Sequence, residues 1–323
     1  MIRRLLFLKS RYFTLLFVMV AVLVFQSGFK PKKKRPITKT ELGKALFFDP
    51  ILSADSSISC ASCHKPEFAF ADTMAFSIGV SGKRTHRNTP SVLNMANRDL
   101  LFWDGRAQSL QEQALFPIQD HDEMNLEIPV AIKRLKRSKR YKTWFLEAFG
   151  RSADQKALSE AIASYEATLE TSESRFDLYM RNELEISANE KVGQKLFVGK
   201  AKCFDCHFSP DFTGDEFKNI GLFDGKTYSD SGRYRITHNP EDLGKFKVPG
   251  LRNVAVTAPY MHDGSMKTLR QVIDYYNDPL ASVPTAINMD STLAKGLNLT
   301  EIEKYQLEKF LNALTDKRFQ PKN

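Results

Sequence analysis

The stretches Cys60-Ala61-Ser62-Cys63-His64 and Cys203-Phe204-Asp205-Cys206-His207 contain all four cysteines of this 323-residue chain. Each is a Cys-x-x-Cys-His pentad, the spacing at which two thiols attach a c-type haem covalently and the following histidine ligates its iron. A lone Cys-x-x-Cys could be a redox pair or half of a zinc site. Two complete copies with no cysteine left over argue against both the redox pair and the zinc site. The sequence therefore predicts two covalently bound haem c groups, with Cys60, Cys63, Cys203 and Cys206 as thioether cysteines and His64 and His207 as iron ligands.

The distance between the pentads predicts two domains. Cys60 and Cys203 are 143 positions apart, about one domain length, and the chain exceeds the size at which a single core stops growing. The segments 43–47 (GKALF) and 193–197 (GQKLF) are similar, and each precedes a pentad, which indicates two related modules. We expect an N-terminal haem c domain at residues 36–180 and a C-terminal haem c domain at residues 181–323.

The apolar periodicity predicts a mainly α fold with long loops. Apolar residues recur at helical spacing through residues 126–148 and 155–186, and further helices are expected to begin near Thr38, Ser187 and Thr300. Residues 49–94, around the first pentad, are rich in Gly, Ser, Pro and Asn, which argues against long regular elements there. No convincing alternating strand is visible. The expected fold is a pair of cytochrome c-like haem domains with long loops.

The N-terminus, residues 1–35, holds the whole net charge of +9 and an export signal. It contains nine Lys and Arg and no acid, which leaves 38 basic and 38 acidic residues in the rest of the chain. A neutral body gives no support for nucleic-acid binding. The apolar run 13–25 is typical of a signal peptide and short for a membrane span, but no clean Ala-x-Ala cleavage site follows. A cleaved signal peptide and an N-terminal membrane anchor both remain open, and either exports the body to the periplasm.

The segment 99–124 contains the next candidate functional side chains. Taken alone, Trp103 is more often a core aromatic than an electron relay, and Glu123 is by default a solvated loop acid. Histidines that could ligate iron are scarce, because outside the pentads the chain has only His86, His121, His238 and His262.

The order of the motifs resembles that of the bacterial di-haem cytochrome c peroxidase family. The resemblance runs from about residue 38 to 315, and the motifs together are highly specific. In chain order they are the first pentad, Arg87-Asn88-Thr89-Pro90, Phe102-Trp103-Asp104-Gly105-Arg106-Ala107 with Gln113, Pro117 and Glu123, the second pentad, Phe212-Thr213, Asn219-Ile220-Gly221, Val248-Pro249-Gly250-Leu251-Arg252-Asn253 and Pro259-Tyr260-Met261-His262-Asp263-Gly264.

The resemblance implies a division of roles between the two haems. The first haem would react with hydrogen peroxide, with Gln113 and Glu123 on its distal side and Pro117 shaping the pocket. The second haem would pass on electrons from a small cytochrome c or cupredoxin, with Trp103 between the haems on the electron route. A carboxylate such as Glu123 can move the proton that peroxide cleavage requires, and Gln113 can stabilise charge on the peroxide.

The resemblance also implies a calcium ion and places one more histidine. Asn88, Thr257 and Pro259 match positions that hold an inter-domain calcium ion, largely through backbone carbonyls and water. His262 would hydrogen-bond a haem propionate instead of ligating iron. A homodimer is compatible with the resemblance, and the sequence does not decide the oligomeric state.

Two positions depart from the pattern of the family. Many members block the first iron with a histidine where this chain has Val80, so we expect an open first haem, with His86 as an exposed loop histidine. Members often ligate the second iron with a methionine where this chain has Tyr276, which is similar to the di-haem enzyme of methylamine utilisation. A phenolate there would lower the reduction potential of the haem. If Tyr276 is only a packing residue, Met266 and Met289 are the alternative ligands.

Three functions from different classes remain open. The first is a cytochrome c peroxidase, the commoner outcome in the family. The second is a di-haem oxidase that acts on a protein partner through high-valent iron. The third is a non-catalytic di-haem electron carrier. The pair of Gln113 and Glu123 argues against the carrier, because a fully ligated haem has no use for them.

Overall fold

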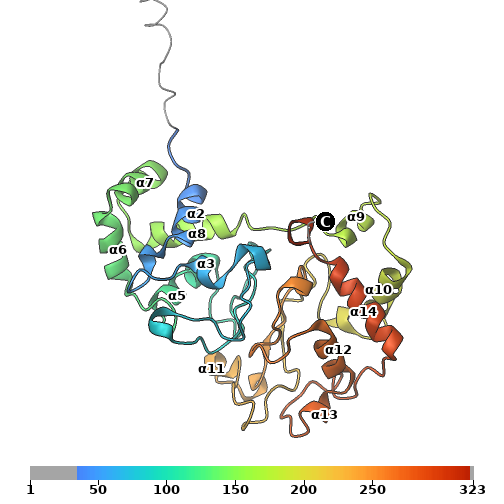
Figure 1. Ribbon diagram of the computed structural model, residues 1–323. Coiled ribbons are helices and arrows are strands. Elements are labelled where there is room, and N and C mark those ends of the chain that lie inside the picture. Colours follow the sequence, from blue (N-terminus) through green and yellow to red (C-terminus); the bar gives the residue numbers. More distant parts are fainter. Residues whose placement is uncertain (1–34, 321–323) are drawn as a thin grey trace, which may run out of the picture. The chain divides into compact units, whose positions relative to one another are not determined.

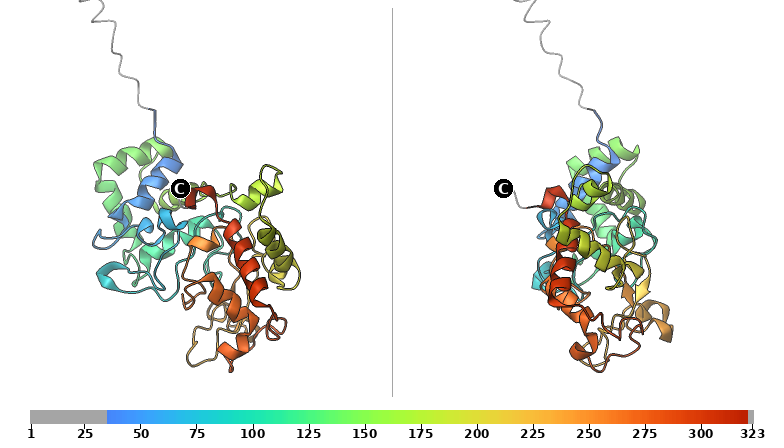
Figure 2. Two further views of the ribbon diagram at one scale, coloured as in Figure 1. Left: turned by 45° about the vertical axis from the view of Figure 1, so that its right-hand side comes forward. Right: turned by 90° about the vertical axis from the view of Figure 1, so that its right-hand side faces the viewer.

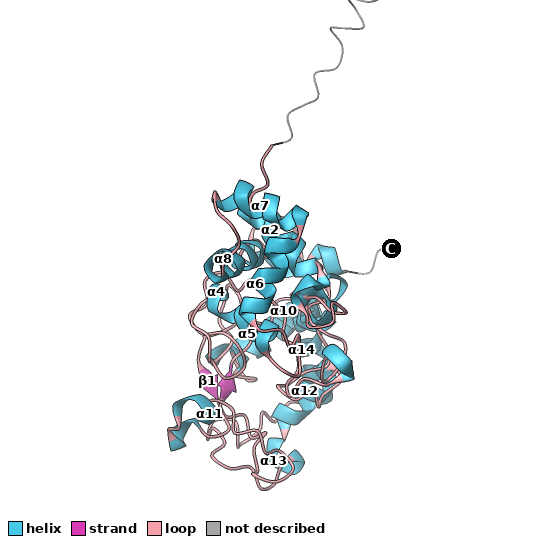
Figure 3. Ribbon diagram, turned by 90° about the vertical axis from the view of Figure 1, so that its left-hand side faces the viewer, coloured by secondary structure: helices cyan, strands magenta, loops and turns pink. Residues whose placement is uncertain are grey.

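The structure, a computed structural model, describes residues 35–320, and residues 37–320 belong to one compact unit. The predicted leader therefore lies outside the described residues. Helices and loops make up nearly all of the described chain, and strand is scarce, which confirms the mainly α prediction (Figures 1 and 3). Within residues 35–320, no helix combines the length and the apolar character needed to cross a membrane.

The first half contains the helices α2 (Lys39–Phe48), α3 (Cys60–Cys63), α4 (Leu110–Gln113), α5 (Leu115–Gln119), α6 (Ile128–Arg137), α7 (Lys139–Phe149) and α8 (Gln155–Glu166). Of these, α2, α5, α6, α7 and α8 contribute side chains to one hydrophobic cluster built from residues 42–162. A capping box of Thr38 and Glu41 begins α2, as the sequence predicted. The periodic run 126–148 is two helices, because Ser138 caps the start of α7.

The second half contains the helices α9 (Arg175–Met180), α10 (Ala188–Val198), α11 (Tyr234–Thr237), α12 (Leu269–Asn277), α13 (Pro279–Ser282) and α14 (Glu301–Ala313) (Figure 1). Of these, α9, α10, α12 and α14 contribute side chains to a separate hydrophobic cluster built from residues 176–314. Capping boxes at Ser187 and Thr300 begin α10 and α14 where the sequence placed them. The run 155–186 is not continuous, since a loop over residues 167–174 separates α8 from α9.

Short elements complete the described chain. Two antiparallel strands, β1 (Phe217–Lys218) and β2 (Phe246–Lys247), pair Phe217 with Lys247. The 3₁₀ turns are Pro50–Leu52, Pro66–Phe68, Val80–Gly82, Cys203–Asp205, Pro240–Asp242, Val254–Val256 and Lys317–Phe319. Residues 49–94 contain only short turns and the one-turn helix α3, which confirms the loop-rich prediction for that region.

A glycine lies at the closest helix crossing in each half. Gly43 on α2 faces α8 so closely that a Cβ atom there would lie 1.8 Å from the Ala161 carbonyl oxygen. Gly193 on α10 faces α14 in the same manner, with the Gln306 carbonyl oxygen 2.0 Å from the Cβ position. These helix pairs are also visible in Figure 2. The similar segments 43–47 and 193–197 therefore have the same structural role. In each, the glycine lets two helices approach without a side chain between their backbones.

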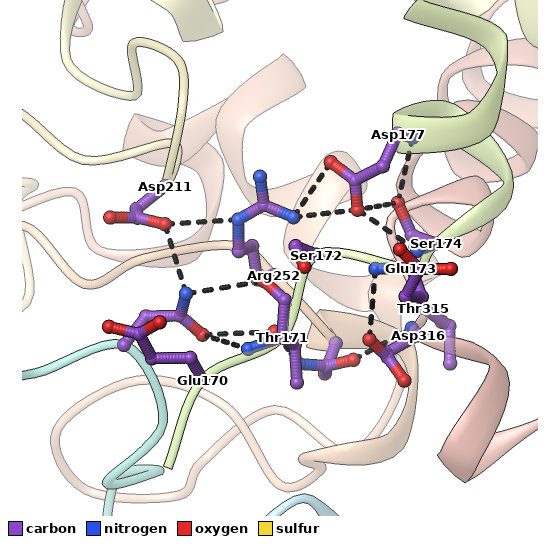
Figure 4. Close-up of polar contacts among 12 residues, drawn as sticks. Glu170, Thr171, Ser172, Glu173, Ser174, Asp177, Asp211, Arg252, Thr315 and Asp316 are labelled. Carbon is purple, nitrogen blue, oxygen red and sulfur yellow. Dashed lines mark hydrogen bonds and ion pairs between the residues drawn. The ribbon is translucent and has the colours of Figure 1, made fainter. Parts of the chain in front are cut away.

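A buried polar network ties the loop 167–174 to the second half of the chain (Figure 4). Arg252 donates hydrogen bonds to both carboxylate oxygens of Asp177, at 3.0 and 2.9 Å, and to Asp211 at 3.0 Å. Asp316 accepts a hydrogen bond from the backbone N–H of Glu173 at 3.1 Å. Because these groups are largely buried, the loss of one partner would leave another charge unpaired and costly.

Candidate functional site

The first pentad forms a single helical turn that presents its histidine for metal binding. Helix α3 spans Cys60–Cys63, and the His64 side chain follows directly after it. The His64 Nδ1 atom lies 3.1 Å from the carbonyl oxygen of Phe70, which can only accept a hydrogen bond. Nδ1 therefore carries the proton, and Nε2 is left with a free lone pair. Burial lowers the pKa of His64, which keeps the ring neutral and able to ligate iron.

The second pentad repeats this arrangement. His207 Nδ1 lies 2.9 Å from the carbonyl oxygen of Phe212, so its Nε2 is also free for a metal. Burial likewise lowers the pKa of His207. The histidine opens into a cavity of about 310 Å³ that is lined mostly by apolar side chains, among them Leu269, Ile273 and Leu297. An apolar cavity next to two thiols and a neutral imidazole suits a haem.

The four cysteines are free thiols in neutral form. None of them forms a disulfide. Burial raises the pKa of Cys203 to about 12 and the pKa of Cys63 and Cys206 to about 11, and it raises the pKa of Cys60 further. Within residues 35–320, no three His, Cys, Asp or Glu side chains are grouped so that they could hold a zinc ion. Neutral thiols beside an imidazole fit the donor set of covalent haem attachment.

Glu123 directs its carboxyl group toward the first pentad. Burial is the main cause of the raised pKa of Cys60 and of Cys63, and the Glu123 charge adds to both shifts. The Glu123 carboxyl group therefore lies close to these thiols. Burial and the neighbouring charges of Asp120 and Asp122 raise the pKa of Glu123 itself to about 7. A carboxyl group with that pKa can both take up and release a proton near neutral pH.

The loops around Glu123 bring the other predicted distal residues into the same region. The N–H of Met124 donates a hydrogen bond of 3.1 Å to the carbonyl oxygen of Pro117 in α5. Gln113 ends the preceding helix α4, and its side chain is half-buried. Gln113, Pro117 and Glu123 thus lie on consecutive elements, and the Met124–Pro117 hydrogen bond ties the Glu123 loop to α5.

Val80 lies beside Glu123 and carries no side-chain atom that could ligate iron. The Val80 N–H donates a hydrogen bond of 2.9 Å to the Glu123 carbonyl oxygen, and the Val80 side chain is buried. The His86 ring is exposed and lies 3.0 Å from the Asp122 carboxylate. The expectation of an exposed loop histidine at position 86 is confirmed.

Trp103 connects the two halves through hydrogen bonds. Its indole Nε1 donates a hydrogen bond of 2.8 Å to the carbonyl oxygen of Asn88, and its own carbonyl oxygen accepts one of 2.8 Å from the N–H of Lys247. The Asn88 N–H donates a hydrogen bond of 2.7 Å to the carbonyl oxygen of His262. Trp103 also lines the cavity of His207. The Trp103 ring is thus fixed by a hydrogen bond to the first half of the chain, and the Trp103 backbone is hydrogen-bonded to the second half.

Tyr276 faces the cavity of the second pentad, whereas its neighbour does not. The Tyr275 hydroxyl donates a hydrogen bond of 2.6 Å to the carbonyl oxygen of Ile220. Tyr276 lines the same cavity as His207, and within residues 35–320 its hydroxyl makes no hydrogen bond. Met266 and Met289 do not line this cavity. The geometry therefore favours Tyr276 over the two methionines as the candidate ligand.

The remaining predicted residues also line this cavity. Asn88, Thr257 and Pro259 all border it, as does His262. The His262 ring is stacked on Phe246 with a centroid distance of 3.7 Å. Asn88 donates its side-chain N–H₂ to the Met74 carbonyl oxygen at 3.1 Å, which leaves its amide oxygen available as an acceptor.

Glu166 lies near the first pentad, although no motif in the sequence singles it out. The Glu166 side chain is 4% exposed, and its Oε2 atom has no hydrogen-bond partner in the described chain. Burial distinguishes it from Glu160, the other acid of α8, and burial depends on how α8 packs. No local sequence signal identifies it.

Two neutral histidines with free Nε2 atoms, each beside a pair of thiols, define this class of protein as a di-haem c-type cytochrome. Comparisons with known proteins then identify the family. The family model for di-haem cytochrome c peroxidase matches residues 37–185. The methylamine utilization protein MauG of Methylorubrum extorquens is 38% identical over 289 residues, which covers 87% of this chain and 80% of the relative.

Two further comparisons agree with this assignment. The cytochrome c551 peroxidase of Nitrosomonas europaea is 38% identical over 242 residues, covering 72% of this chain and 71% of the relative. The crystal structure of a MauG-like protein associated with microbial copper homeostasis superimposes with a TM-score of 0.79 at 33% identity, covering 90% of this chain and 97% of that one. The chain belongs to the di-haem cytochrome c peroxidase family. It is an oxidoreductase with two covalently bound haem c groups.

Proposed function

We propose that this protein is a cytochrome c peroxidase that reduces hydrogen peroxide to water with electrons from a small exported cytochrome c or copper protein. The bound haems supply the redox chemistry, in which peroxide takes up two electrons and two protons and gives two water molecules. The observation that carries the proposal is the half-buried Glu123 carboxyl group near the first pentad, with a pKa of about 7. A di-haem electron carrier has no use for such a group.

The side chains of the first half bind peroxide and move its proton. His64 would hold the first haem through Nε2, and Val80 supplies no side-chain ligand that would compete with peroxide for the iron. The Gln113 amide orients the peroxide and stabilises negative charge on it. The Glu123 carboxylate takes a proton from peroxide and returns it to the departing oxygen.

The side chains of the second half supply electrons. His207 and Tyr276 would hold the second haem, and Trp103 would lie on the electron route between the haems. His262 would hydrogen-bond the second haem. The backbone and amide oxygens of Asn88, Thr257 and Pro259 would hold a calcium ion, which prefers oxygen ligands.

The organisation of the chain follows from the same proposal. Residues 36–180 form the peroxide-reacting haem domain, and residues 181–323 form the electron-transferring haem domain. Residues 1–35 export the protein to the periplasm as a signal peptide or hold it there as an N-terminal anchor. The protein works as a monomer or a homodimer.

A second candidate function is oxidation of a protein partner. Two observations favour it: Tyr276 faces the second haem cavity, and relatives of this chain are named methylamine utilization protein MauG. A phenolate ligand lowers the potential of a haem and so makes it a poorer acceptor for electrons from a small cytochrome. Rapid peroxide turnover with a reduced cytochrome c supports the peroxidase, and its absence in a holoprotein that still reacts with peroxide supports the oxidase.

The variant Glu123→Gln tests the proton-moving role. The amide keeps the shape of the side chain but cannot accept a proton, so the rate of peroxide turnover should fall by about 10²–10⁴-fold at unchanged haem content. The matched control is Glu127→Gln, because Glu127 is an exposed carboxyl only four residues away. Unchanged turnover in Glu123→Gln would eliminate the role of Glu123.

A further inference from the structure

Glu166 is a buried carboxyl group that the proposed mechanism does not use. It is the last residue of α8, is 4% exposed, and has one carboxylate oxygen without a hydrogen-bond partner among the described residues. Burial alone raises its pKa to about 8. A buried carboxylate without a partner is costly, so burial favours the neutral, protonated acid at this position.

The surroundings of Glu166 contain no positive charge that would fix it in the ionised form. Two titratable groups face it: the Cys60 thiol, whose pKa is raised first by burial and then by the Glu166 charge, and the Tyr165 phenol, whose pKa is raised by the same two causes. Cys60 ceases to titrate once it is bonded to haem. Within residues 35–320, no Lys or Arg pairs with Glu166.

We propose that Glu166 is the redox-linked proton acceptor of the first haem. The Glu166 carboxyl group lies close to Cys60, whose sulfur is bonded directly to that haem. Oxidation of a haem adds one positive charge to its core, and in a poorly solvated region this charge favours a nearby carboxylate over the protonated acid. Reduction removes the positive charge and leaves the carboxylate without compensation.

The coupled step balances one electron with one proton. When a one-electron donor, such as a small redox protein, reduces the first haem, a proton from solvent adds to the Glu166 carboxylate and gives the neutral acid. The net charge of the buried region is then the same before and after reduction. On oxidation the electron leaves, and Glu166 releases the proton. The proposal depends on the two bound haems and not on peroxide turnover.

The expected consequence is a reduction potential that depends on pH. For one electron coupled to one proton, the potential of the first haem should fall by up to about 59 mV per pH unit, which corresponds to a tenfold change in the equilibrium constant. Glu123 also lies near Cys60 and titrates near neutral pH. The measurement is therefore made in the Glu123→Gln holoprotein, so that Glu123 makes no contribution.

The test combines redox titrations at pH 6, 7, 8 and 9 with infrared difference spectra of the oxidised and reduced full-length holoprotein. In Glu123→Gln, the potential of the first haem should fall with pH, and reduction should produce the band of a protonated carboxyl group. Addition of Glu166→Gln should remove both signals. Addition of Glu160→Gln, on the exposed side of the same helix, should leave both unchanged.

Two results would overturn the proposal. One is a pH-independent potential in Glu123→Gln between pH 6 and 9, which needs no change at Glu166 and so does not depend on whether that variant folds. The other is a pH dependence and a carboxyl band that persist in the double variant. Neither result bears on whether the protein is a peroxidase, because no step of the test requires turnover.

Discussion

The rate at which the protein reacts with peroxide should rise with pH through about 7, because Glu123 must be ionised to accept a proton. The cause lies in the structure: burial, together with the charges of Asp120 and Asp122, raises the pKa of this carboxyl group to about 7. An ordinary glutamate would be ionised throughout the neutral range, and the rate would then be nearly independent of pH.

The size of the effect follows from the pKa. With a pKa of about 7, roughly one tenth of Glu123 is ionised at pH 6 and roughly nine tenths at pH 8. The second-order rate constant for peroxide should therefore rise about tenfold between these two pH values. The variant Asp120→Asn removes one of the charges that raise the pKa, so its profile should shift to lower pH. Because Asp120 is exposed, solvent screens its charge, and the shift should stay below about one pH unit.

The assay is stopped-flow mixing of the resting holoprotein with excess hydrogen peroxide, with the Soret absorbance followed from pH 5.5 to 8.5. Glu127→Gln serves as the control and should keep the wild-type profile. A rate that does not change between pH 6 and 8, or a profile that Glu123→Gln leaves intact, would refute the assignment of Glu123 as the base.

Two further variants test the packing and the second haem. In a denaturant titration, Gly193→Ala should lower the free energy of unfolding by about 1–3 kcal/mol, because the new Cβ would meet the backbone of α14. The control Val192→Ala, at an exposed neighbouring position, should have little effect on the free energy of unfolding. Tyr276→Phe should remove a ligand of the second haem, change the optical and magnetic spectra of that haem and raise its reduction potential. The control Tyr275→Phe should only remove a hydrogen bond to Ile220. Identical spectra in wild type and Tyr276→Phe would rule out phenolate ligation.

Features that depend on short stretches of sequence could be predicted. The pentads, and the capping boxes that begin α2, α10 and α14, are each encoded within a few consecutive residues, and the structure contains them where the sequence placed them. The similarity of segments 43–47 and 193–197 also corresponds to a shared structural feature, since Gly43 and Gly193 each face a partner helix at close range.

Features that depend on long-range packing could not be predicted. The apolar period continues past Glu166, so the sequence did not show that α8 ends there or that a loop crosses to the second half before α9. The burial of Glu166 has the same origin, because its neighbours in the fold come from distant parts of the chain. Without the family resemblance, the sequence predicts that Glu123 is a solvated loop acid. The fold instead buries it, and only the resemblance to a family indicated this in advance.

The claim on which this account depends is that the two haems differ in their axial ligands, and spectra of the resting protein test it most directly. Electron paramagnetic resonance and optical spectra of the oxidised holoprotein should show a high-spin first haem held by His64 alone and a low-spin second haem held by His207 and Tyr276. Two low-spin, fully ligated haems that do not react with peroxide would contradict the account.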